Sequence, residues 1–65
     1  MIAKIDRIVV RRYGDSGYSK LEIHWIDARG KRGLTEGEPD LRNAHMAALV
    51  ARGVREGVRV EQVRS

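Results

Sequence analysis

The sequence predicts a small α+β domain, in which one helix packs on a small antiparallel sheet of three to four strands in the order β-β-(β)-α-β. A stretch rich in β-branched residues, 2–13, and a stretch that alternates between apolar and polar residues, 18–27, predict paired strands. One alanine-rich stretch, 41–52, predicts a helix. The chain has 65 residues and no cysteine. We therefore expect a single domain over 1–65, whose limited core favours self-association.

The first expected strand, residues 2–13, alternates imperfectly between apolar and polar positions. Ile8 points to one face, whereas Ile5 and Val9 point to the other. Either a bulge at residues 6–7 shifts the register, or both faces of this strand are partly covered.

The next segment, Gly14–Gly17, predicts a turn, because glycine permits positive φ and the Asp and Ser between bond back to the backbone. Within residues 18–27, Leu21, Ile23 and Trp25 share one face, which indicates that they enter the core. We expect this strand to form an antiparallel hairpin with the first one.

A second turn, at residues 27–30, leads to a short third strand over 31–35. Gly33 weakens this strand, which is typical of a sheet edge. A loop over 36–40 then connects it to the helix.

The helix is expected over 41–52, with two possible starts. Either Pro39 occupies the first helical position, or Asp40 is the N-cap and Leu41 begins the helix. Gly53 fits the position just after the helix. A closing strand is predicted by the valines that follow: Val58, Val60 and Val63.

This helix carries more apolar surface than one contact with a small sheet needs. Ala44 and Ala48 lie on one face, and a second apolar stripe consists of Met46, Leu49 and Val50. We expect this second stripe to form the interface of a homodimer or of another protein partner. The alternative is that the small alanines are simply exposed.

Positive charge is concentrated in the first half of the chain. The formal net charge is +4, and residues 1–34 contain eight Lys or Arg against four acids, whereas residues 35–65 contain five of each. Such an imbalance favours a polyanionic partner, nucleic acid above all. The candidate nucleic-acid contacts are cations of this half: Arg7, Arg11, Arg12, Arg29, Lys31 and Arg32.

Three of these cations, Arg29, Lys31 and Arg32, lie beside two glycines in one turn, so they suit contacts with a phosphate backbone. The alternatives are a solvated loop or ion pairs with the acids of residues 36–40. The layout also resembles small DNA-binding domains that lay a three-stranded sheet, backed by a helix, into the major groove. This resemblance concerns the order of elements and implies a free sheet face that meets DNA.

Other classes of site lack the residues that they need. His24 and His45 have no spaced partners and cysteine is missing, so we predict no metal site, and we predict no cofactor and no catalytic site. No apolar run approaches the about 20 residues of a membrane span. The start has no signal-peptide pattern, so we expect a cytoplasmic protein.

These observations predict a non-enzymatic basic binding module that contacts nucleic acid through its N-terminal hairpin region. The alternative is a small protein-binding inhibitor or adaptor, for example a phage-encoded protein that occupies a host defence or regulatory complex. The clustered cations favour the first function, and the apolar helix stripe favours the second. The two differ in salt dependence, because phosphate contacts weaken steeply as salt rises.

Overall fold

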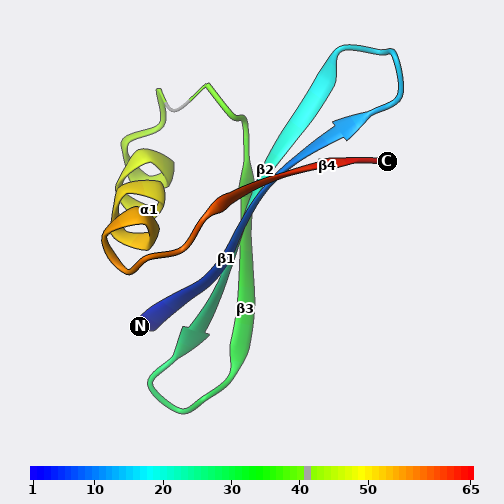
Figure 1. The fold of residues 1–65 in the computed structure, drawn as a ribbon. Helices are drawn as coiled ribbons and strands as arrows, with labels where there is room; N and C mark the ends of the chain where they lie inside the picture. The colour runs from blue at the N-terminus through cyan, green and yellow to red at the C-terminus, as the bar shows by residue number, and fades with distance from the viewer. Residues whose placement is uncertain (41) are drawn as a thin grey trace.

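The computed structural model describes residues 1–40 and 42–65 as a four-stranded sheet with one helix packed on one face (Figure 1). This confirms the predicted small α+β fold and the order of its elements. Within the described chain, no helix is long and apolar enough to cross a membrane. The elements are β1 (Ile2–Tyr13), β2 (Tyr18–Asp27), β3 (Arg32–Gly37), α1 (Ala44–Arg55) and β4 (Val60–Arg64).

The sheet is mixed, with strand order β3-β2-β1-β4. β2 is antiparallel to both β1 and β3, whereas β4 is parallel to β1. β1 and β3 therefore run in the same direction, and α1 returns the chain across the sheet to the edge opposite β3 (Figure 1). A return of this kind makes β4 parallel to β3 and β1. The last strand thus departs from the wholly antiparallel sheet that the sequence predicts.

β1 contains a bulge, which is one of the two explanations that its imperfect alternation allows. The register with β2 shifts between Ile5 and Arg7. The shift places Ile5 on the face that also carries Ile8, so that both enter one core. The backbone N–H of Ile5 donates to a carboxylate oxygen of Glu56 at 2.8 Å, which fastens the bulge to the end of α1.

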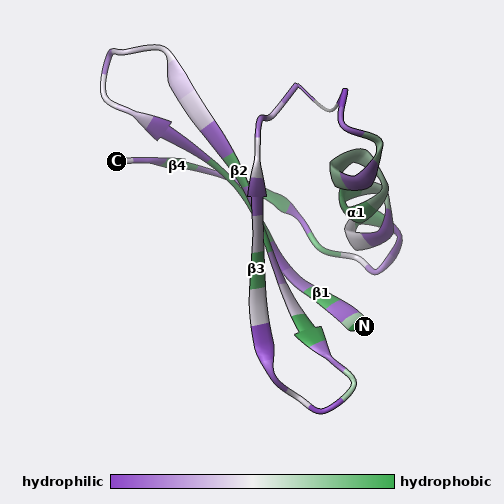
Figure 2. Cartoon of the chain, turned by 180° about the vertical axis from the view of Figure 1, so that it is seen from behind, coloured by the Kyte–Doolittle hydropathy of each residue, from purple (hydrophilic) through white to green (hydrophobic). Residues whose placement is uncertain are grey.

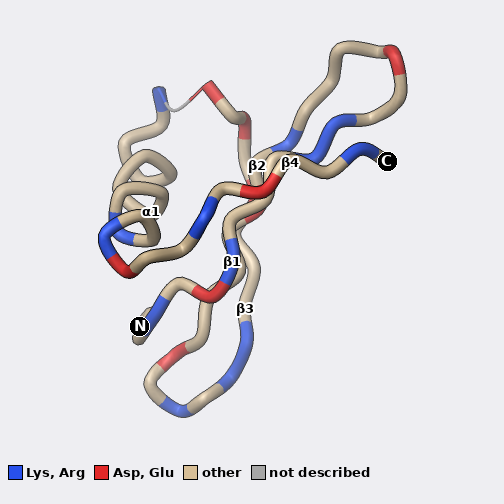
Figure 3. Tube along the Cα trace, in the orientation of Figure 1, with Lys and Arg blue, Asp and Glu red and all other residues tan. Residues whose placement is uncertain are grey.

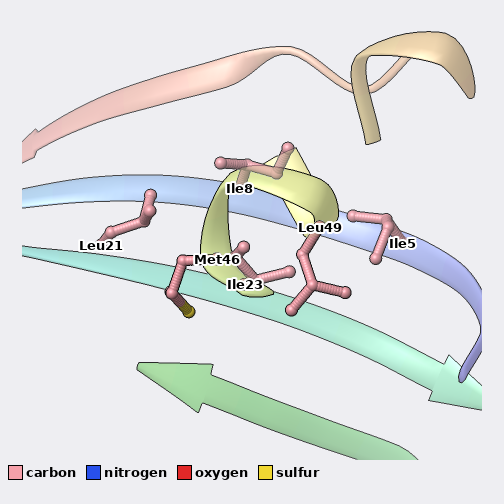
Figure 4. Packing of buried hydrophobic residues seen from close by; sticks show 6 residues of the cluster. All are labelled: Ile5, Ile8, Leu21, Ile23, Met46 and Leu49. Atoms are coloured by element: carbon pink, nitrogen blue, oxygen red, sulfur yellow. The ribbon is translucent and has the colours of Figure 1, made fainter. Parts of the chain in front are cut away.

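The core lies between α1 and the sheet (Figure 4). Its buried side chains are Ile5, Ile8, Leu21, Ile23, Met46 and Leu49. Full burial of one side chain of this kind contributes about 1.5–3 kcal/mol. This single cluster therefore holds the helix on the sheet.

The structure corrects the placement of the predicted partner stripe. Met46 and Leu49 are 3% and 7% exposed and face the sheet, and Val50 packs against the same cluster. Side chains that the sheet already covers are not available to a second copy or to another protein. Ala44 and Ala48 are exposed instead, as the alternative predicts.

Both ends of α1 also differ from the prediction. The N-cap is Asn43, not one of residues 39–40, and its side-chain oxygen accepts hydrogen bonds from two backbone N–H groups of the first turn at 2.9 and 3.3 Å. The predicted start at Leu41 lies outside the described residues. At the other end Gly57, with φ of 85°, adopts the left-handed conformation that was expected of Gly53.

Gly53 lies inside α1 because the helix must approach β1 closely there. A Cβ at this position would lie 2.5 Å from Ile8 Cδ1 and 3.1 Å from Ile5 Cγ2. Gly33 on β3 is required in the same way, since the indole ring of Trp25 lies directly against it. Both glycines are close-approach positions, and neither ends an element.

Candidate nucleic-acid interface

The face of the sheet opposite α1, the open face, carries a set of charged side chains. They come from alternate positions on all four strands and are Arg7, Arg11, Lys20, Glu22, His24, Glu36 and Glu61. Val9 is fully buried on this face, between Glu22 and Glu61 on the adjoining strands. Long charged side chains cover such a position with their aliphatic stems while their charged ends stay in water.

Glu22 occupies the centre of the open face and is 6% exposed. Arg11 donates to both of its carboxylate oxygens, at 2.9 and 3.3 Å. Lys20 and His24 approach the same carboxylate at 3.8 and 3.4 Å. The hydrogen bonds from Arg11 lower the pKa of Glu22 and raise the pKa of Arg11 itself, so the pair stays ionised.

Two further ion pairs flank Glu22. Arg7 donates to both carboxylate oxygens of Glu61, at 2.7 and 3.0 Å, and thereby lowers the pKa of Glu61. Lys20 Nζ lies 3.0 Å from Glu36 Oε2, a contact that raises the pKa of the lysine. The lysine and arginines of the open face are therefore balanced by carboxylates, and this face has little excess charge with which to attract a polyanion.

The turn between β2 and β3 and the first residue of β3, hereafter together the basic turn, carry Arg29, Lys31 and Arg32. One carboxylate oxygen of Asp27 accepts hydrogen bonds from the backbone N–H groups of Arg29 and Lys31, at 2.8 and 2.9 Å, and so shapes the turn. Arg32 pairs with Asp6 at 3.2 Å. Arg29 and Lys31 have no acidic side chain at ion-pair distance among residues 1–40 and 42–65.

The sheet extends beyond α1 at one end, where the β1–β2 hairpin projects with the last part of β4 beside it (Figure 1). We call this end, residues 12–19 and 62–65, the arm. Arg12 and Arg64 are register partners on β1 and β4, so their side chains lie next to each other on the side of the sheet that α1 covers elsewhere. The N–H of Ser65 donates to the Arg12 carbonyl oxygen at 2.7 Å, which keeps the two strands paired to this point.

An open depression of about 330 Å³ lies on the arm and is lined by Arg12, Gln62, Val63 and Arg64. In the chain as described, neither arginine has an acidic side chain at ion-pair distance. Figure 3 shows that cations of β1 and β4 come together at this end. Two guanidinium groups beside an open hollow suit a phosphate group, whose oxygens accept paired hydrogen bonds from arginine.

The six cations predicted for nucleic acid therefore fall on three separate surfaces. Arg7 and Arg11 lie on the open face with paired charges, Arg12 lies on the arm, and the other three form the basic turn at the far end of the sheet. Sequence reasoning missed Arg64. Its place beside Arg12 depends on the parallel pairing of β4 with β1, for which the sequence has no local signal.

Together the fold and its charges define a small α+β domain with a helix-covered sheet face, a charge-paired open face and a basic arm. Comparisons with protein-family models, curated proteins and solved structures found no match for the chain. Over the described ranges, no three His, Asp or Glu side chains gather as ligands of a metal ion would.

Proposed function

We propose that the protein is a non-enzymatic, cytoplasmic binding module for double-stranded nucleic acid, and that Arg12 and Arg64 supply its central phosphate contacts. One observation carries the proposal: these arginines lie next to each other beside an open depression, and among residues 1–40 and 42–65 they have no acidic partner such as Arg7 and Arg11 have. A free guanidinium binds a phosphate without first leaving a carboxylate, so each contact adds affinity.

The aromatic side chains favour a duplex over a single strand as the ligand. Modules for single strands stack bases on several exposed aromatic rings. In this chain Trp25 packs against the core, and Tyr13 and Tyr18 lie against each other with ring centroids 5.5 Å apart, so that of the three aromatic side chains Tyr18 alone is exposed. Phosphate contacts without base stacking give binding that depends little on base sequence.

The alternative, a protein-binding inhibitor or adaptor, rests on the apolar helix stripe. Met46 and Leu49 pack against the sheet, so the surface that would have met a protein partner is occupied inside the chain. The arm, in contrast, keeps two cations that have no acidic side chain at ion-pair distance among the residues that the structure describes. We therefore favour nucleic acid as the partner.

The test is fluorescence anisotropy with labelled duplex DNA, duplex RNA and single-stranded DNA, titrated from about 50 to about 200 mM salt. We expect duplex binding that weakens steeply with salt. The double variant Arg12→Gln/Arg64→Gln should lose at least about tenfold in duplex affinity, because two charge-assisted contacts disappear. The slope of log affinity against log salt should flatten by about 2 for the same reason.

Arg55→Gln/Arg59→Gln is the matched control. Neither residue has an acidic partner at ion-pair distance in the described part of the chain, and the substitutions remove the same two charges at a distance from the arm. The control lowers the long-range attraction equally but leaves the proposed contacts in place. If both double variants weaken binding equally, or if the parent binds no duplex at about 50 mM salt, the proposal is wrong.

A further inference from the structure

β3 is an exposed edge of the sheet. It pairs with β2 on one side, and the side chains of Arg32, Leu34 and Glu36 alternate along it as exposed residues of the open face. Figure 2 shows the resulting pattern, in which β3 is hydrophilic toward both ends and hydrophobic in the middle. An edge strand of this kind is a template on which another strand can pair.

The backbone groups of the same three residues form the free edge. Next to the basic turn, the N–H of Asp27 donates to the carbonyl oxygen of Lys31 at 2.9 Å. Residue pairs in an antiparallel ladder alternate between bonded and non-bonded positions. Counting from that bond, Gly33 and Thr35 bond to β2. The N–H and C=O groups of the three exposed residues therefore point outward.

β3 is also complementary to itself in the antiparallel direction. When Leu34 of one copy lies opposite Leu34 of a second copy, Arg32 of each copy lies opposite Glu36 of the other. Opposite charges and apolar side chains that face each other across strands stabilise a sheet. This alignment makes the outward-pointing residues the bonded pairs, so the backbone and the side chains specify the same register.

The charges beyond the two ends of β3 extend this complementarity. The basic turn lies at one end, and Glu38 and Asp40 follow the other end (Figure 3). A strand of this length separates the two groups by about 20 Å within one copy, which explains why none of the ion pairs in the described residues joins them. In an antiparallel pair of copies, the basic turn of one lies beside the acidic loop of the other.

The second edge of the sheet, β4, lacks this complementarity when it is aligned about its central residue. An antiparallel alignment of β4 with itself about Gln62 places Glu61 opposite Val63 and Val60 opposite Arg64. No pair of opposite charges forms in this alignment, because Glu61 and Arg64 each face a valine. Alignment about the central part of the strand therefore pairs opposite charges on β3 and not on β4.

We propose that two copies of this chain associate through antiparallel β3–β3 pairing centred on Leu34, which joins their sheets into one. The arms then lie at the two outer edges, so this proposal is independent of nucleic-acid binding. A short edge contact buries less surface than the about 1,200 Å² of stable interfaces. The dimer should accordingly form at high concentration and dissociate on dilution.

Sedimentation velocity of the full chain, from about 10 µM to about 1 mM, measures this equilibrium. Leu34→Lys places two ammonium groups at the centre of the interface and should weaken dimerisation at least about tenfold. Val60→Lys is the matched control, because Leu34 and Val60 are 45% and 42% exposed and lie on opposite edges. The control should keep the parent's dissociation constant within about twofold.

A charge exchange tests the register. Arg32→Glu makes both facing pairs acidic, and Glu36→Arg makes both basic, so each variant alone should stay monomeric where the parent is dimeric. A one-to-one mixture of the two restores both opposite-charge pairs and should form a heterodimer with nearly the parent's affinity. Far-ultraviolet circular dichroism confirms the fold of each variant, since Arg32 and Glu36 also pair with Asp6 and Lys20.

Three results would overturn the proposal. The parent could remain monomeric over the whole concentration range. Val60→Lys could weaken dimerisation as much as Leu34→Lys does, or more. The mixed charge variants, with both folded, could fail to associate. Dimerisation that Leu34→Lys abolishes and that the mixed pair recovers would establish the β3 interface.

Discussion

Arg11 and Arg12 are neighbours on β1, yet they belong to two regions that use positive charge differently. Arg11 lies on the open face and donates to both oxygens of Glu22, which is 6% exposed. Arg12 lies on the arm beside Arg64, and no acidic side chain within the described ranges pairs with either of them. The first arginine stabilises the sheet, and the second is available to a ligand. Cations adjacent in sequence thus have different roles according to what the neighbouring strands place beside them.

The largest expected loss of stability follows acidification, because low pH protonates all the paired carboxylates at once. Hydrogen bonds from arginines lower the folded-state pKa of two carboxylates: Arg11 acts on Glu22, and Arg7 acts on Glu61. The pKa of Glu56 is lowered chiefly by the hydrogen bond from the backbone N–H of Ile5 and, to a smaller extent, by the one from Arg52. A lowered folded pKa adds stability above the ordinary value of about 4.3, and this stability is lost as pH falls through the folded pKa. The melting temperature should be level from about pH 7 to about pH 5.5 and fall below about pH 4.5.

Thermal melts followed by circular dichroism at constant ionic strength measure this profile. A melting temperature that stays constant or rises between about pH 6 and about pH 3 would contradict the stabilising role of these pairs.

A smaller effect is expected when one partner of the central pair is removed. Glu22→Gln leaves Arg11 facing an uncharged amide in a poorly hydrated position and should lower the free energy of unfolding by about 1–3 kcal/mol. The matched control is Glu38→Gln, at an exposed acid that joins none of the ion pairs in the described chain. It should stay within about 0.5 kcal/mol of the parent. Urea denaturation measures the free energy of unfolding of both variants. Equal losses would show that the Arg11–Glu22 pair contributes no more than an exposed acid does.

The smallest effect comes from changing the geometry of a pair and keeping its charge. Arg7→Lys replaces two parallel hydrogen bonds to Glu61 with contacts from a single ammonium group. This pair is about half exposed, so the melting temperature should fall by no more than about 1–3 °C. Arg55→Lys is the control and should show no change. A loss of stability as large as that of Glu22→Gln would show that the Arg7–Glu61 pair stabilises the sheet as much as the central pair does.

The sequence predicts much of the fold because its signals are local. Alternation in residues 18–27 predicts the hairpin, and the irregular pattern around Ile5 allows a bulge as one of two explanations; both are found. The end of α1 escapes prediction, because Gly53 satisfies the same local pattern as a helix-ending glycine. Its actual role is to let the helix approach Ile8, and that contact depends on packing between distant segments.

The candidate site is less predictable, because it depends on partners that only the fold brings together. The hairpin brings Arg11 diagonally close to Glu22, so the sequence holds enough information to infer that pair. The pairing of Arg7 with Glu61, and of Arg12 with Arg64, requires β4 to lie parallel to β1. The predicted helix stripe fails for the related reason that periodicity identifies two apolar faces without showing which one meets the sheet.

The most direct test of the central claim compares Arg11→Gln with Arg12→Gln by two measurements on each variant, the melting temperature and the affinity for duplex nucleic acid at about 50 mM salt. The variants remove the same charge from adjacent residues. We predict that Arg11→Gln lowers the melting temperature and largely keeps the affinity, whereas Arg12→Gln keeps the melting temperature and weakens binding several-fold. If stability and affinity fall together in both variants, or if Arg12→Gln changes neither, the division between structural and available arginines is wrong.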